Sequence, residues 1–77
     1  MDEETRAKKL ADLTEIEGFE SVDALIQATA LDSVSPGICT RPGCDYTVEV
    51  EPDQDRGWCE ICDKGTVASA LILARLI

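Results

Sequence analysis

The fold is decided by two cysteine pairs, Cys39-Thr-Arg-Pro-Gly-Cys44 and Cys59-Glu-Ile-Cys62, which are separated by residues 45–58. Their C-x4-C and C-x2-C spacing is close to that of a four-thiolate zinc site, although the first pair is looser than usual. We therefore expect all four cysteines to be ligands of one structural Zn²⁺ per chain. Such a site is closed, because protein atoms fill every coordination position.

The length of the chain explains why a metal would matter. A chain of 77 residues buries only about 60% of its unfolded surface, so its core is marginal. Its aromatic side chains are few: Phe19, Tyr46 and Trp58. A structural zinc adds apparent binding free energy on the order of 10 kcal/mol, comparable to the whole stability of a small domain. We predict a single small domain over residues 1–77.

Disulfides are the other use of paired cysteines. The acidic start Met1-Asp2-Glu3-Glu4 has no apolar run behind it, so we expect no secretory signal and a cytoplasmic protein. Thiols stay reduced in that compartment, and paired cysteines there usually bind metal. A redox-active Cys59–Cys62 pair would need a thioredoxin-like context that the chain lacks. Iron held by four thiolates is the alternative to zinc.

The amino-acid composition argues against two classes of function, enzymes and nucleic-acid-binding proteins. Histidine is absent, which removes the commonest general base, and a closed metal site offers no position to a substrate. We therefore expect no enzyme. The formal net charge of −9 argues against binding to nucleic acid, which depends on neutralising phosphates. The charge fits a partner with a basic surface, or serves solubility alone.

Residues 1–32 predict a helical hairpin. Residues 3–17 carry an apolar stripe at every third position: Ala7, Leu10, Leu13 and Ile16. Gly18 is a natural left-handed stop, and Phe19 could pack back on the last turn. Ser21 is placed to cap a second helix over residues 22–31. A helical hairpin allows a DNA-binding interpretation, but neither helix has the cluster of basic residues that phosphate contacts need.

The rest of the chain, residues 38–77, predicts two metal-binding turns, a β-hairpin and a helix. Residues 32–38 are expected to form a loop, because serine, proline and glycine gather there. Alternation over 46–51 predicts a half-buried strand, and 56–59 would form the return strand of a hairpin. Its open end would bring together the first knuckle (residues 39–44) and the second knuckle (residues 59–65), where Gly65 lets the backbone curl.

The last predicted element is a helix over residues 67–77, capped by Thr66. It is apolar on nearly every side but, at about 11 residues, too short to span a bilayer. A helix that is apolar all round is either buried or paired with another chain. We therefore expect it to form a homodimer or a partner interface.

Several side chains near the cysteines have both a plain and a functional interpretation. Arg41 and Lys64 would balance the charge of the zinc centre, or contact a partner. Tyr46 and Trp58 would cover the zinc and form a small core, or serve as a stacking platform. Five acids could form an acidic face that mimics nucleic acid: Glu49, Glu51, Asp53, Asp55 and Glu60.

Knuckle, hairpin, knuckle and helix in that order resemble a zinc ribbon or treble-clef module. Further stretches, such as Pro36-Gly37-Ile38-Cys39, Gly57-Trp58-Cys59-Glu60 and Thr66-Val67, make the chain similar to small four-cysteine proteins of bacteriophages, prophages and proteobacteria. That resemblance implies an intracellular bacterial or phage setting and a metal, but no activity. In those proteins the turn after the last cysteine often has Gly or Asn, whereas this chain has Asp63-Lys64-Gly65.

The sequence thus predicts an α+β fold with two N-terminal helices, a zinc-bound hairpin and a C-terminal apolar helix. The expected function is that of a structural-zinc adaptor acting through protein–protein contacts. The alternatives are an acidic nucleic-acid mimic that inhibits a basic host factor, and a DNA-binding regulator.

Overall fold

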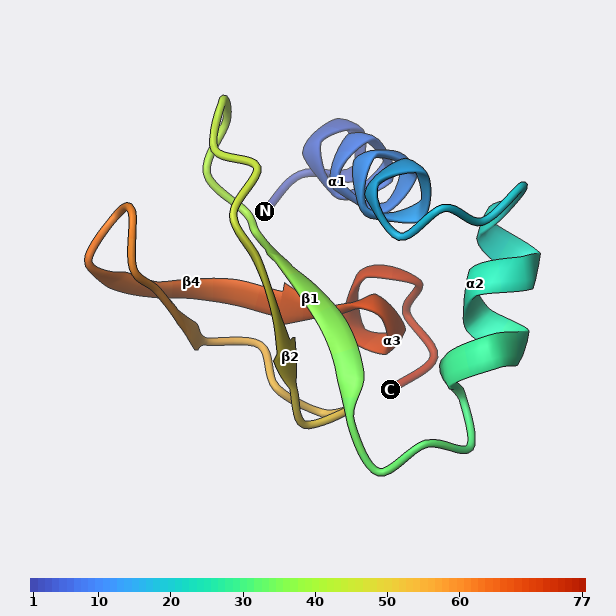
Figure 1. The fold of residues 1–77 in the computed structure, drawn as a ribbon. Helices are drawn as coiled ribbons and strands as arrows, with labels where there is room; N and C mark the ends of the chain where they lie inside the picture. Colours follow the sequence, from blue (N-terminus) through green and yellow to red (C-terminus); the bar gives the residue numbers. More distant parts are fainter.

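The computed structural model describes all residues, Met1–Ile77, and has the expected α+β class. Helices and a curled antiparallel sheet follow one another along the chain (Figure 1). The elements are α1 (Glu3–Ile16), α2 (Val22–Thr29), β1 (Ser35–Cys39), β2 (Thr47–Val50), β3 (Gly57–Cys59), β4 (Lys64–Ser69) and α3 (Ala70–Leu73). The helices lie to one side of the sheet, away from the turn that joins β3 to β4.

The predicted helix at the N-terminus is confirmed as α1, and its end is the one the sequence indicates. Gly18 has a φ of +81°. The amide of Phe19 then donates to the carbonyl of Thr14 at 3.0 Å, so the chain reverses and Phe19 packs against the core. The buried face of α1 does not coincide with the predicted apolar stripe. Leu13 is fully buried, but Ala7 and Ile16 are exposed.

The second helix is also confirmed, although it ends earlier than expected. The Ser21 hydroxyl accepts from the amide of Ala24 at 3.1 Å and caps α2 at its N-terminus. The helix ends at Thr29, so Leu31 falls outside it and is exposed. Leu25 is the fully buried residue of α2 and joins the core below α1.

The predicted loop over residues 32–38 is wrong for most of its length. Ser35–Cys39 forms β1, an inner strand that pairs with both β2 and β4. Its glycine permits a close approach between strands instead of a turn. A Cβ on Gly37 would lie 2.9 Å from side-chain carbons of both Val50 and Val67. Because Pro36-Gly37 has the composition of a turn, the sequence did not indicate the inner strand β1.

The predicted hairpin between 46–51 and 56–59 is also wrong, although both strands exist. The strand order is β2-β1-β4-β3, so β2 and β3 occupy opposite edges and do not pair with each other. The reason is the extra strand β4, whose second half was predicted as the start of the C-terminal helix. Thr66 and Val67 are β-branched and favour a strand at this position.

The C-terminal apolar run is divided between a strand and a short helix. Ser69, not Thr66, caps α3, because its hydroxyl accepts from the amide of Ile72 at 3.1 Å. The helix ends after one turn, where Arg75 adopts a φ of +60°. Most of the run is buried inside the domain, and only Leu76 and Ile77 remain as exposed apolar residues. No helix of the chain is both long and apolar enough to cross a membrane.

The buried residues form two separate clusters. The larger one lies between the helices and the sheet and consists of Leu13, Leu25, Ile38, Ala68, Ala70 and Leu73. The smaller one contains Cys39, Cys59 and Val67, with Cys44 and Cys62 packed against it. One end of the molecule is therefore organised around the cysteines.

Candidate metal centre

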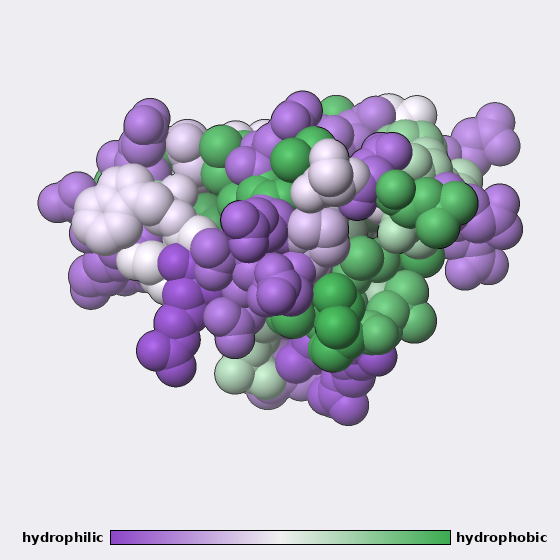
Figure 2. Space-filling view, turned by 90° about the horizontal axis from the view of Figure 1, so that it is seen from below, coloured by the Kyte–Doolittle hydropathy of each residue, from purple (hydrophilic) through white to green (hydrophobic).

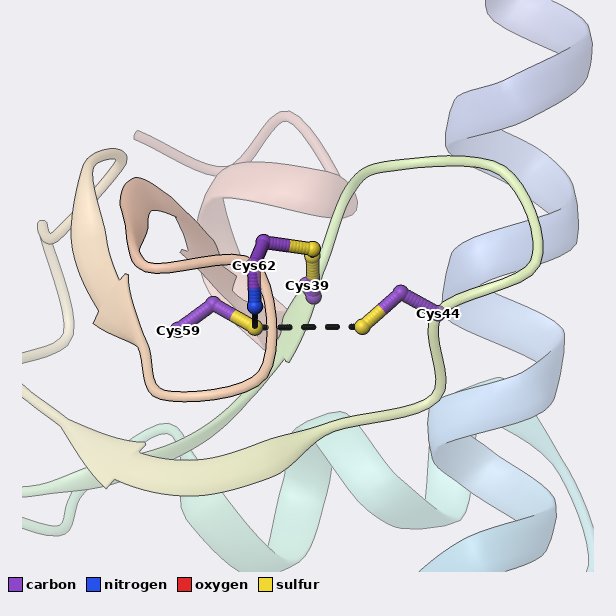
Figure 3. A group of neighbouring side chains, drawn as sticks. All are labelled: Cys39, Cys44, Cys59 and Cys62. Atoms are coloured by element: carbon purple, nitrogen blue, oxygen red, sulfur yellow. Dashed lines mark hydrogen bonds between the residues drawn. The ribbon is translucent and has the colours of Figure 1, made fainter.

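Four different parts of the fold contribute the cysteines. Cys39 ends β1 and Cys59 ends β3, while Cys44 and Cys62 lie in the turns that follow these strands. Their side chains point toward one another at one end of the sheet (Figure 3). The four predicted ligands are thus brought together, although by strand pairings that differ from the predicted hairpin.

The first knuckle owes its shape to Pro42-Gly43. The amide of Cys44 donates to the carbonyl of Arg41 at 3.1 Å, which closes a four-residue turn. Gly43 has a φ of +83°, and proline followed by such a glycine is the composition of a type II turn. The turn directs the Cys44 sulfur back toward β1.

The second knuckle is held by hydrogen bonds to Cys59. The Cys59 sulfur accepts from the amide of Cys62 at 3.3 Å, and its carbonyl accepts from the amide of Asp63 at 2.8 Å. The residue in the left-handed conformation is Asp63, with a φ of +57°, and not the predicted Gly65. Gly65 lies within β4, where a Cβ would come within 3.0 Å of the Arg56 carbonyl oxygen.

Two of the distances between the sulfurs match those of a tetrahedral metal site. All four Sγ atoms lie within 4.8 Å of one another. The Cys39–Cys62 and Cys44–Cys59 pairs are separated by 3.7 Å and 3.8 Å. With a zinc–sulfur bond of about 2.3 Å, the sulfurs of a tetrahedral site lie about 3.8 Å apart. A disulfide needs about 2.05 Å, and all four cysteines are free. The cluster can therefore bind a metal ion.

The thiols differ in acidity. Burial opposes ionisation of Cys39, but hydrogen bonds from the Thr66 hydroxyl, the Arg41 backbone and the neighbouring thiols outweigh it and lower its pKa to about 7. Burial, helped by hydrogen bonds with the other thiols and by the charge of Cys39, raises the pKa of Cys62 to about 12. One thiolate thus makes the next harder to form. A cation at the centre removes that conflict, because metal-bound thiols are deprotonated.

The surroundings of the cluster correct two expectations. Thr66, predicted as a helix cap, places its hydroxyl oxygen 3.1 Å from the Cys39 sulfur. Tyr46 packs against the cluster as predicted, but Trp58 is 56% exposed and does not form a core beside it. The cover of the site is therefore a threonine and a tyrosine, with the tryptophan facing solvent.

A basic side chain that the sequence did not indicate contacts the first knuckle. Arg41 and Lys64 are exposed in their knuckles. Lys9, from α1, is buried and donates to the carbonyl of Cys44 at 2.5 Å. Its only sequence signal is a position four residues before the buried Leu13, on the same helix face. The five acids of the predicted acidic face, Glu49, Glu51, Asp53, Asp55 and Glu60, are all exposed.

Comparisons of this chain with protein-family models, curated proteins and solved structures gave no match.

Proposed function

We propose that the chain is a small protein whose fold is stabilised by one Zn²⁺, bound by Cys39, Cys44, Cys59 and Cys62. The observation that carries this proposal is the sulfur cluster, with two sulfur–sulfur distances of 3.7 and 3.8 Å and no disulfide. Four thiolates suit zinc or iron. Zinc is favoured because no other feature of the chain calls for electron transfer.

The role of the ion would be structural. With four protein ligands the coordination shell is complete, so no position remains for water or substrate. The smaller of the two buried clusters is itself built from the cysteines and Val67. Without the metal, the four thiols would stay in contact although each thiolate makes the next one harder to form. This end of the domain also has few other apolar residues to stabilise it.

Chelation tests the structural role. Removing the metal from purified protein should lower the folded circular dichroism signal without abolishing it, because the larger buried cluster contains no cysteine. It should also shift the fluorescence of Trp58, the single tryptophan, which lies next to Cys59. Added zinc should restore both signals. An unchanged spectrum after complete metal removal would overturn the proposal.

The biochemical role that we propose is that of an adaptor, which binds another protein through its surface. Apolar side chains gather on the side of the molecule where α2 and α3 lie (Figure 2). A groove of about 430 Å³ lies there, lined on its apolar side by Leu10, Val22, Ile26, Ala74 and Leu76. An exposed groove of this kind favours a protein partner or a second copy of the chain.

Sedimentation and capture experiments with wild type and Leu76→Glu test the adaptor role. A dimer or a captured partner that is lost in the variant would support this surface. A complex that is unchanged in Leu76→Glu would show that the interface lies on another surface.

An acidic mimic of nucleic acid is the second candidate function, because the five acids of the predicted acidic face are all exposed. It predicts a complex with a basic protein that weakens steeply as salt is raised.

A further inference from the structure

Lys9 is buried beside the cysteine cluster without an acidic partner. The residue is only 3% exposed, and its Nζ atom donates to the carbonyl of Cys44 at 2.5 Å. The ion pairs of the chain involve Arg6, Lys8 and Arg75, but not Lys9. Buried lysines are nearly always paired, because it is costly to remove an ammonium group from water. Lys9 therefore lacks the counter-charge that its position requires.

The carboxylates that line a groove together with Lys9 do not pair with it. Asp12 and Asp45 line the groove between α1 and the first knuckle, together with Lys8 and Lys9. The carboxylate of Asp12, however, accepts from Lys8 at 3.0 Å, and Asp45 forms no ion pair. The remaining candidate is the cysteine cluster. Four thiolates around a divalent ion carry a net charge of about −2.

We propose that Lys9 is the counter-cation of the loaded metal centre and the residue that positions Cys44 within it. This inference rests on the proposed four-thiolate site. Cys44 provides both the carbonyl that Lys9 contacts and one of the four sulfurs. The ammonium group offsets the negative charge of the centre, and its hydrogen bond holds the first knuckle against α1. Metal binding and the docking of α1 are therefore coupled.

Three variants separate charge from packing. Lys9→Met removes the charge and keeps the chain length, Lys9→Arg keeps the charge, and Lys8→Met is the matched control on the exposed face, where the Lys8 side chain is 73% exposed. Zinc affinity is measured by competition with a chromophoric chelator at fixed pH and salt. Lys9→Met should bind zinc about 10- to 100-fold more weakly than wild type, as for other residues that orient metal ligands. Lys8→Met should stay within about threefold of wild type, and Lys9→Arg should lie between Lys9→Met and wild type.

The stability of the metal-free chain provides a readout that a merely structural lysine would not give. Without metal, Lys9→Met should be at least as stable as wild type, because it removes an uncompensated buried charge. With zinc, it should be less stable than wild type. An ordinary packing or hydrogen-bonding role would instead lower the stability of both forms.

The outcomes distinguish this inference from the proposed function. If wild type binds no metal, the zinc proposal fails. If wild type binds one zinc and Lys9→Met binds it as tightly as Lys8→Met does, the role of Lys9 fails while the metal site stands. Should Lys9→Met not fold, acetylation of wild type decides. Zinc should protect Lys9 at least about tenfold relative to Lys8, and chelation should remove that protection. Equal reactivity of Lys9 with and without zinc would overturn the proposal.

Discussion

Two residues other than glycine, Asp63 and Arg75, adopt the left-handed backbone conformation, with φ values of 57° and 60°. Asp63 lies directly after the last cysteine, where its amide bonds to the Cys59 carbonyl at 2.8 Å. A side chain in this conformation costs about 1–2 kcal/mol, less for aspartate than for most residues. The second knuckle therefore stores a small strain at the edge of the metal site.

Asp63→Gly should relieve this strain and stabilise the zinc-loaded protein by about 0.5–1 kcal/mol, because glycine adopts positive φ without steric cost. Urea unfolding at constant zinc concentration measures the change. Asp55→Gly, which removes another exposed acid where φ is not positive, is the control and should not stabilise the protein. If Asp63→Gly is no more stable than wild type, the strain assigned to the second knuckle is contradicted.

At the scale of the elements, the two long helices were predictable because their signals are local. Ser21 caps α2, and Gly18 ends α1 by adopting positive φ. The sheet was not predictable in the same way. Pro36-Gly37 has the composition of a turn, and the apolar run from Val67 onward has the composition of a helix. Pro36-Gly37 and the first part of the apolar run, residues 67–69, became strands because pairing between β1 and β4 buries them, and such pairing depends on contacts between distant parts of the chain.

Gly37 provides a test of this topology. Gly37→Ala should destabilise the protein by about 1–3 kcal/mol, because its methyl group would meet Val50, Val67 and the Ala68 carbonyl at about 3 Å. Thermal unfolding of the zinc-loaded protein measures the loss.

Val50→Ala is the matched partner in a double-mutant cycle, since it shortens one of the obstructing side chains. It should cost less stability in the Gly37→Ala background than in wild type. Additive effects would show that β1 and β2 do not approach each other at Gly37 as described.

At the scale of the whole molecule, the cysteine cluster could be predicted from the sequence and its supporting contacts could not. The spacing of the cysteines was sufficient to identify the cluster, because each pair closes through a short local turn. The contacts of Lys9 and Thr66 with the cluster join residues 35 and 27 positions apart. No local pattern indicates them, and they exist only once α1 and β4 have docked.

The acidity of the cluster sets how metal binding depends on pH. The pKa of Cys39 is lowered to about 7 and that of Cys62 is raised to about 12, so the metal-free cluster keeps most of its protons near neutral pH. Zinc must displace them, and its affinity should therefore fall as pH falls, by more than about one decade between pH 8 and 7. Chelator competition across this range measures the slope. An affinity independent of pH would exclude thiolate ligands.

The central claim is that four cysteines bind one zinc ion per chain, and native mass spectrometry of protein purified without added metal tests it most directly. The account predicts a chain carrying one zinc, with the metal lost on chelation. The same spectra show whether the chain is a monomer or a dimer. A metal-free chain about two or four mass units lighter than its reduced sequence would reveal disulfides and contradict the account.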